Sequence, residues 1–177
     1  MVKSPTLLLD EEICRANIQR MVEKAERHAL TLKPHFKTHQ SAAIGEWFRD
    51  EGVRSITVSS VQMAEYFAEH GWNDITIGFP VNIREVEMLK TLSEQIDTLS
   101  LFAYNDYALD ALEKNLRTPV QIYIEIDTGA NRSGLAPHQP EEISRIKNRI
   151  ESSANMQFKG FYSHPGTPIL RDQGRKS

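Results

Sequence analysis

The sequence predicts an α/β fold, namely a partial (β/α)8 TIM-type barrel of about six βα units. Short β-branched runs alternate with amphipathic stretches along most of the 177 residues, which is typical of repeated βα units. An open doubly wound sheet would show the same alternation of strands and helices. The phosphate-loop motifs of open sheets, GxGxxG and GxxxxGK(S/T), do not occur in the sequence, and this favours the barrel. A complete barrel has eight units in about 250 residues, so we expect its C-terminal units to be absent.

The first predicted elements are a helix, a short strand and a second helix. Apolar residues recur at helical spacing over residues 10–29, and Asp10 is a suitable N-cap at the start of this segment. The stretch LTLKPHF at 30–36 is predicted to be a strand. Residues 41–51 are predicted to form a helix, which ends before Gly52.

The remaining chain repeats a strand followed by a helix. The predicted strands cover residues 55–59, 74–79, 98–103, 120–127 and 158–164, and the predicted helices cover residues 61–70, 83–95, 105–115 and 140–152. With the strand at 30–36 this makes six parallel strands. Their interiors are expected to be apolar on both faces, as in buried parallel sheets.

Composition and charge exclude several classes of protein. With 40% hydrophobic and 25% charged residues, the chain is expected to be a soluble globular domain. A net charge of -3 gives no reason to expect a nucleic-acid partner. The single cysteine, Cys14, excludes an internal disulfide and a multi-cysteine zinc site. The N-terminal apolar run is too short for a signal peptide or a membrane span, so we expect a cytoplasmic protein without a membrane partner.

Polar and reactive side chains collect directly after the predicted strands. In a βα barrel the carboxyl ends of the strands form one rim, which carries the active site. The residues at this predicted rim are Lys37 and His39, Ser59 and Ser60, Asp127 and Arg132, and His164.

Lys37 lies between two histidines in the stretch PHFKTH. A lone lysine after a strand is ordinarily a solvated surface residue. At a barrel rim, among apolar walls and other cations, a lysine loses proton affinity and becomes a usable nucleophile for Schiff-base formation. A zinc site built from His35 and His39 is disfavoured, because Pro34 indicates extended chain and a four-residue spacing aligns side chains only on a helix. We therefore expect His39 to be a neighbour of Lys37.

Two later stretches carry polar residues beside glycines. In DTGANRSGL, the glycines on either side of Arg132 let the backbone approach a ligand, and arginine is a fixed-charge donor suited to an aromatic oxygen. The simpler interpretation is a turn with a surface ion pair to Asp127. In GFYSHPG, Tyr162 and His164 point to the same side of the strand end. The histidine is either a core residue or an imidazole that stacks on a planar cofactor.

Four stretches in this order carry a resemblance that covers nearly the whole chain: PHFKTH, ITVSSVQMAEYFAEHGWNDITIGFP, EIDTGANRSGL and GFYSHPG. Together they resemble the N-terminal barrel of the D-threonine aldolase and D-serine dehydratase family, within the alanine-racemase-like (fold-type III) enzymes that use pyridoxal 5'-phosphate. The resemblance implies that residues 1–177 form an incomplete cofactor-binding barrel domain. It implies that Lys37 holds the cofactor as an internal aldimine and that Arg132 contacts the ring hydroxyl region. His164 would pack on the ring face, and Tyr162 would line the same pocket.

The implied activity is that of a pyridoxal-phosphate-dependent lyase, an aldolase or dehydratase, on D-3-hydroxy amino acids such as D-threonine or D-serine. Two alternatives remain open at this point. One is a non-enzymatic pyridoxal-phosphate homeostasis protein, which also holds a lysine, an arginine and a histidine at the rim. The other is an inactive, truncated remnant.

The sequence also departs from the family pattern. A tyrosine commonly follows the HxG motif, whereas this chain has Ile169 at that position. The phosphate-binding loops, the C-terminal β domain and the divalent-metal ligands of the family have no counterpart here, so no residue is assigned as a metal ligand. We expect a fragment, a truncated gene product or one half of an assembly, with weak activity alone. Because an open parallel edge tends to pair with itself, we also expect a homodimer.

Overall fold

The computed structural model describes residues 8–164 and contains one sheet of five parallel strands. The strands are β1 Ser55–Val58, β2 Asp74–Pro80, β3 Thr98–Phe102, β4 Val120–Glu125 and β5 Met156–Tyr162. Each strand pairs with the next one in the sequence, so the spatial order is β1-β2-β3-β4-β5. A doubly wound sheet would reverse its strand order at a switch point. The sequential order is that of a barrel wall, and the predicted α/β barrel fold is confirmed.

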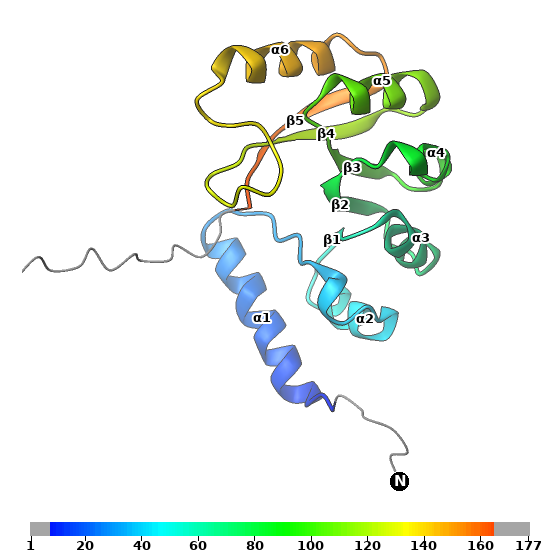
Figure 1. Ribbon diagram of the computed structural model, residues 1–177. Coiled ribbons are helices and arrows are strands. Elements are labelled where there is room, and N and C mark those ends of the chain that lie inside the picture. Colours follow the sequence, from blue (N-terminus) through cyan, green and yellow to red (C-terminus); the bar gives the residue numbers. More distant parts are fainter. Residues whose placement is uncertain (1–7, 165–177) are drawn as a thin grey trace, which may run out of the picture.

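The helices lie outside this wall, where most of them cover the sheet and the first packs against the second (Figure 1). They are α1 Glu11–Arg27, α2 Ala42–Asp50, α3 Val61–Glu69, α4 Val86–Gln95, α5 Asp106–Asn115 and α6 Pro140–Glu151, with short 3-10 helices η1 Phe36–Thr38 and η2 Ile83–Glu85. Four of the helices begin where a side chain accepts the N–H group three residues later, which satisfies an otherwise unpaired donor. These N-caps are Asp10, Ser41, Ser60 and Asn105. Within residues 8–164, no helix has the length and apolar character needed to cross a bilayer.

The face of the sheet that the helices cover holds the hydrophobic core. We call it the helix-covered face, and its fully buried strand residues include Ile56, Ile75, Leu99, Leu101 and Ile122. Helix residues that belong to the same core include Phe67, Leu89, Leu92, Leu109, Leu112 and Ile146. Burial of each such side chain contributes about 1.5–3 kcal/mol. The helix-covered face therefore supplies most of the stability of the sheet.

The opposite face, which we call the open face, is polar. Thr57, Thr76, Ser100, Gln121 and Gln157 lie in register across all five strands and form one polar row. The Oγ of Ser100 donates to the Oε1 of Gln121 over 3.1 Å. The prediction that the strands are apolar on both faces is therefore wrong. Alternate residues point to opposite faces of a strand, and here the alternation is apolar and polar.

The prediction of a strand at residues 30–36 is also wrong. This segment runs beside β1 but forms a single parallel bridge, between His35 and Thr57. The N–H of Thr57 donates to the carbonyl oxygen of Pro34 over 2.9 Å. Because proline has no N–H to donate, the ladder cannot extend through residue 34. The segment nevertheless runs parallel to β1 and places η1 at the carboxyl edge of the sheet.

Candidate functional site

The carboxyl edge of the sheet carries all four of the predicted site residues. Lys37 lies in η1, directly after the segment that runs beside β1. Arg132 lies in the loop after β4, Tyr162 is the last residue of β5, and His164 follows two residues later. Since the strands are parallel, their carboxyl ends meet at one edge.

Lys37 presents an exposed amine at this edge. Its Nζ forms no hydrogen bond or ion pair with any part of the chain between residues 8 and 164. The backbone around it is held on both sides. The N–H of Lys37 donates to the Nδ1 of His35 over 3.3 Å, and the Nε2 of Gln40 donates to the carbonyl oxygen of Lys37 over 3.2 Å. The turn is therefore fixed while the amine remains available.

His35 is the close neighbour of Lys37 that sequence reasoning missed. Burial, followed by the positive charges of Lys37 and His164, lowers the pKa of His35, and a hydrogen bond to the backbone of Thr57 acts in the opposite direction. The imidazole is therefore neutral at neutral pH.

The ring of His39, predicted to be a neighbour of Lys37, packs among aromatic side chains. Its ring packs 4.5 Å from the ring of Phe36 and stacks 5.8 Å from the ring of Phe48, measured between centroids. Burial lowers the pKa of His39, so it behaves as a neutral aromatic residue. In the part of the chain that the structure describes, no three His, Cys, Asp or Glu side chains form a possible metal site.

Tyr162 and His164 lie next to each other. The Tyr162 hydroxyl is 3.5 Å from the Nδ1 of His164, at the limit of a hydrogen bond. The ring of Tyr162 packs against Phe102 with 4.1 Å between centroids. Burial and then the charge of Glu125 raise the pKa of Tyr162, while Arg132 opposes the shift. The phenol therefore keeps its proton at neutral pH and can donate a hydrogen bond.

Arg132 pairs with Glu125 rather than with Asp127. Its Nη2 lies 3.9 Å from the Oε1 of Glu125, and the arginine side chain is 52% exposed whereas the glutamate side chain is only 4% exposed. The Oε2 of Glu125 is buried and has no hydrogen-bond partner among residues 8–164. Sequence reasoning missed Glu125. The available signal was an acidic residue at the end of a buried strand, where an unpaired charge is costly.

The loop that carries Arg132 is shaped by its own backbone contacts. The Oδ1 of Asp127 accepts the N–H groups of Gly129 over 2.9 Å and of Asn131 over 3.0 Å, and these bonds lower the pKa of Asp127. Gly134 has a φ of +99°, and a Cβ at that position would lie 2.8 Å from the carbonyl oxygen of Glu125. Only glycine allows the loop to return this close to β4.

A cavity of about 310 Å³ lies on the open face below this edge. It is lined by Thr31, Lys33, Thr57, Thr76, Phe102, Tyr123 and Tyr162. Inside it the Nζ of Lys33 forms a 2.8 Å ion pair with the Oδ1 of Asp74, so this lysine, unlike Lys37, already has a carboxylate partner. Tyr162 connects the cavity to the residues of the edge.

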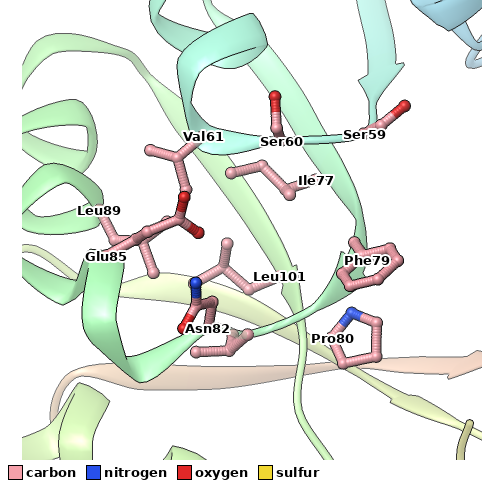
Figure 2. Close-up of a pocket in the computed structure, with 11 residues that line it drawn as sticks. Ser59, Ser60, Val61, Ile77, Phe79, Pro80, Asn82, Glu85, Leu89 and Leu101 are labelled. Carbon is pink, nitrogen blue, oxygen red and sulfur yellow. The ribbon is translucent and has the colours of Figure 1, made fainter.

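A second cavity, of about 210 Å³, lies between the end of β2, α3 and η2 and contains none of the four predicted residues (Figure 2). Val61, Ile77, Leu89 and Leu101 form much of its wall, and Ser59, Ser60 and the side chain of Glu85 lie around it. The predicted rim residues Ser59 and Ser60 therefore border this second cavity. Ser60 accepts the N–H of Met63 as the N-cap of α3.

Two residues that were not predicted, His35 and Glu125, lie beside the predicted site residues. His35 lies next to Lys37, His164 lies beside Tyr162, and Glu125 lies opposite Tyr162 in the sheet and near Arg132. The departure from the family pattern at Ile169 lies outside the described residues.

Comparisons with known proteins identify the family of the chain. Residues 9–175 match the family described as alanine racemase, N-terminal domain. The D-serine dehydratase of Dictyostelium discoideum is 25% identical, over 93% of this chain and 45% of that protein. The D-threo-3-hydroxyaspartate dehydratase of Delftia sp. is 26% identical, over 96% of this chain and 45% of that protein.

Among solved structures, D-threonine aldolase from Filomicrobium marinum has a TM-score of 0.84 at 22% identity, over 90% of this chain and 43% of that one. This likeness shows the shared fold. The chain spans less than half the length of each of these relatives. The resemblance to D-serine dehydratases and D-threonine aldolases, inferred from four short stretches, is confirmed. Because the family match extends over residues 9–175, the chain belongs to the alanine racemase N-terminal domain family.

Proposed function

We propose that this chain binds pyridoxal 5'-phosphate through Lys37 and serves a lyase, an aldolase or dehydratase, that acts on D-3-hydroxy amino acids. The observation that carries the proposal is the unpaired amine of Lys37 on the same edge as Arg132, Tyr162 and His164. The relatives support the reaction class, because they are named D-serine dehydratase, D-threo-3-hydroxyaspartate dehydratase and D-threonine aldolase.

The residues at the edge fit the cofactor by their chemistry. An aldehyde needs an amine that is free to react, and no carboxylate among residues 8–164 pairs with the Nζ of Lys37. A planar ring needs flat neighbours, which the imidazole of His164 and the phenol of Tyr162 supply. A phenolic oxygen needs a fixed positive donor, which Arg132 supplies. We assign no phosphate ligand in this chain.

Pyridoxal phosphate, when bound, supplies an electron sink for cleavage of a bond at the α carbon of an amino acid. The protein residues have separate tasks around it. Lys37 would hold the cofactor through its amine, which has no ion-pair partner among residues 8–164. Glu125 places a buried carboxylate 3.9 Å from the guanidinium of Arg132. Tyr162 keeps the proton on its hydroxyl at neutral pH, because burial and Glu125 raise its pKa.

The substrate class follows from the relatives and not from a contact in this structure. The names of the relatives share a D-configured amino acid, and serine, threonine and 3-hydroxyaspartate all carry a hydroxyl on the β carbon. A lyase for such a substrate removes that hydroxyl as water or breaks the bond between the α and β carbons. D-threonine and D-serine are therefore the first substrates to test.

Chemical trapping tests the cofactor part of the proposal. The 177-residue chain is incubated with pyridoxal phosphate and reduced with borohydride, and the modified peptide is identified by mass spectrometry. We expect the adduct on Lys37, its loss in Lys37→Ala and its retention in Lys33→Ala, which removes the paired lysine as a matched control. An adduct spread over other lysines, unchanged in Lys37→Ala, would overturn the assignment.

Turnover assays test the reaction class. Acetaldehyde from D-threonine and pyruvate from D-serine are measured with and without a divalent metal. Formation of either product, abolished in Lys37→Ala, is the expected result. A trapped Lys37 adduct without either product would contradict the lyase assignment and favour a cofactor-binding protein without enzymatic activity.

A further inference from the structure

We propose that His35 is a positioning residue that holds Lys37 at the carboxyl edge by accepting the backbone N–H of Lys37 on the Nδ1 of a neutral imidazole. The proposal rests on the proposed role of Lys37 as the cofactor lysine and adds a pH-sensitive support for it. His35 touches the backbone of Lys37 and not the reacting amine, so it acts through its neighbour.

The first support is the local geometry. Lys37 lies in a single turn of 3-10 helix, whose first N–H groups have no partner within the helix. His35 is the N-cap of this turn, with extended φ and ψ of -91° and 111°, and its ring accepts the N–H of Lys37. The cap therefore acts on the backbone of the residue whose side chain must reach the cofactor.

A comparison with the other caps shows what is special here. The side-chain caps of the other helices between residues 8 and 164 are oxygen acceptors, on Asp10, Ser41, Ser60, Asn82 and Asn105. Serine and asparagine oxygens do not titrate, and an aspartate cap changes only in acid. A histidine Nδ1 accepts a hydrogen bond only while it carries no proton. The turn of Lys37 is thus held by an acceptor that is lost when the imidazole takes a proton.

The second support is the packing that fixes the ring. The backbone of His35 is bridged to Thr57 of β1, and the ring lies against Gly78 of β2. A Cβ on residue 78 would be 2.9 Å from the Cγ2 of Thr57 and 3.6 Å from the Nε2 of His35. Gly78 therefore leaves the space in which the threonine and the imidazole fit side by side.

The third support is the charge around the ring. The titratable groups that face it are Lys37 on η1 and His164 after β5, whereas β1 and β2 contribute Thr57 and Gly78, which do not titrate. Burial and both cationic neighbours lower the pKa of His35. The acceptor is consequently present at neutral pH. As the pH falls through the lowered pKa, Nδ1 takes a proton and the N–H of Lys37 loses its partner.

Nuclear magnetic resonance tests this cap in the chain without cofactor. We expect the ring of His35 to carry no proton on Nδ1 at neutral pH, and the protection factor of the Lys37 amide, in which the intrinsic pH dependence of exchange is divided out, to fall about fivefold when His35 becomes protonated. His35→Asn keeps an acceptor that does not titrate, so the protection factor should become independent of this protonation. His35→Phe keeps a ring without an acceptor and should show a low protection factor at all pH values. His138→Asn removes an exposed histidine elsewhere and should behave as the wild type.

Borohydride trapping across the same pH range links the cap to cofactor loading. The Lys37 adduct of the wild type should decline in acid more steeply than that of His35→Asn, and His35→Phe should load several-fold less with an unchanged circular dichroism spectrum. A His35→Phe chain with wild-type amide protection and loading would overturn the proposal. Absence of a Lys37 adduct in the wild type at every pH would refute the proposed function. The amide measurement would still show whether His35 caps the turn that carries Lys37.

Discussion

The two faces of the same five-stranded sheet differ sharply in chemistry. On the helix-covered face, Ile56, Ile75 and Ile122 are fully buried among helix side chains. On the open face, a row of hydroxyl and amide side chains from Thr57 to Gln157 crosses all five strands, and the candidate site lies at the edge above it. Parallel sheets usually carry apolar residues on both faces.

The same strands therefore contribute to stability through the helix-covered face and to the candidate site through the open face. Each strand contributes alternate residues to the two faces, so neighbouring residues in the sequence have different tasks. Substitutions on the helix-covered face should lower the free energy of unfolding. Substitutions on the open face and in the edge loops should leave the core intact and alter the site.

The strongest test of this separation is a pair of neighbours in β4. Ile122→Ala should destabilise the chain by about 2–5 kcal/mol, because it removes a fully buried side chain and leaves a cavity. Gln121→Ala, one residue earlier, removes the hydrogen bond from Ser100 and should cost about 1 kcal/mol. Urea denaturation followed by circular dichroism measures both. Equal losses would contradict the separation of the two faces.

A second test concerns the loop that carries Arg132. Gly134→Ala should destabilise the chain by roughly 2–3 kcal/mol, because the new Cβ meets the backbone of Glu125 at 2.8 Å and φ is +99°. Gly129→Ala is the matched control, since φ is +115° there but no atom lies within 4 Å of the added Cβ. It should cost only about 1 kcal/mol. Similar values for the two variants in denaturant titrations would show that the close approach to Glu125 is unimportant.

The smallest expected effect concerns pH. Because the N–H groups of Gly129 and Asn131 lower the pKa of Asp127 in the folded chain, the loop is supported above the unfolded pKa of about 3.9 and loses that support as the pH falls through the folded pKa. The amide resonances of Gly129 and Asn131 should therefore shift together in acid. Asp127→Asn should abolish this shift, and Asp97→Asn, at another exposed acid, should preserve it. A shift that persists in Asp127→Asn would assign the titration to another group.

Much of the fold was predictable from local chemistry. Asp10 marked the start of the first helix because a short side-chain acceptor satisfies a free backbone N–H. The positions of the strands could be predicted from runs of β-branched residues. The exception was residues 30–36, where Pro34 interrupts the ladder. The alternation of apolar and polar residues in VQIYIE indicates the polar open face. The general rule that parallel strands are apolar on both faces gave the wrong prediction here.

Some residues of the candidate site were likewise predictable from the sequence, and others were not. Arg132 and His164 could be located in the sequence because they follow strands, and Tyr162 because it ends one. Lys37 follows a segment that runs beside β1, and the carboxyl ends of parallel strands share one edge. His35 and Glu125 could not be assigned their partners. Their neighbours, His164 and Tyr162, are distant in the sequence, and no local spacing encodes those contacts.

Residue type and position were therefore enough to identify where elements begin, which residues could react and at which edge they gather. Tertiary packing decided which side chains meet. It placed His39 among aromatic rings, directed Arg132 to the buried Glu125, and left the Nζ of Lys37 without a partner among residues 8–164. The physical reason is that burial and contact between distant segments set the cost of each charge, and these arise only when the strands come together.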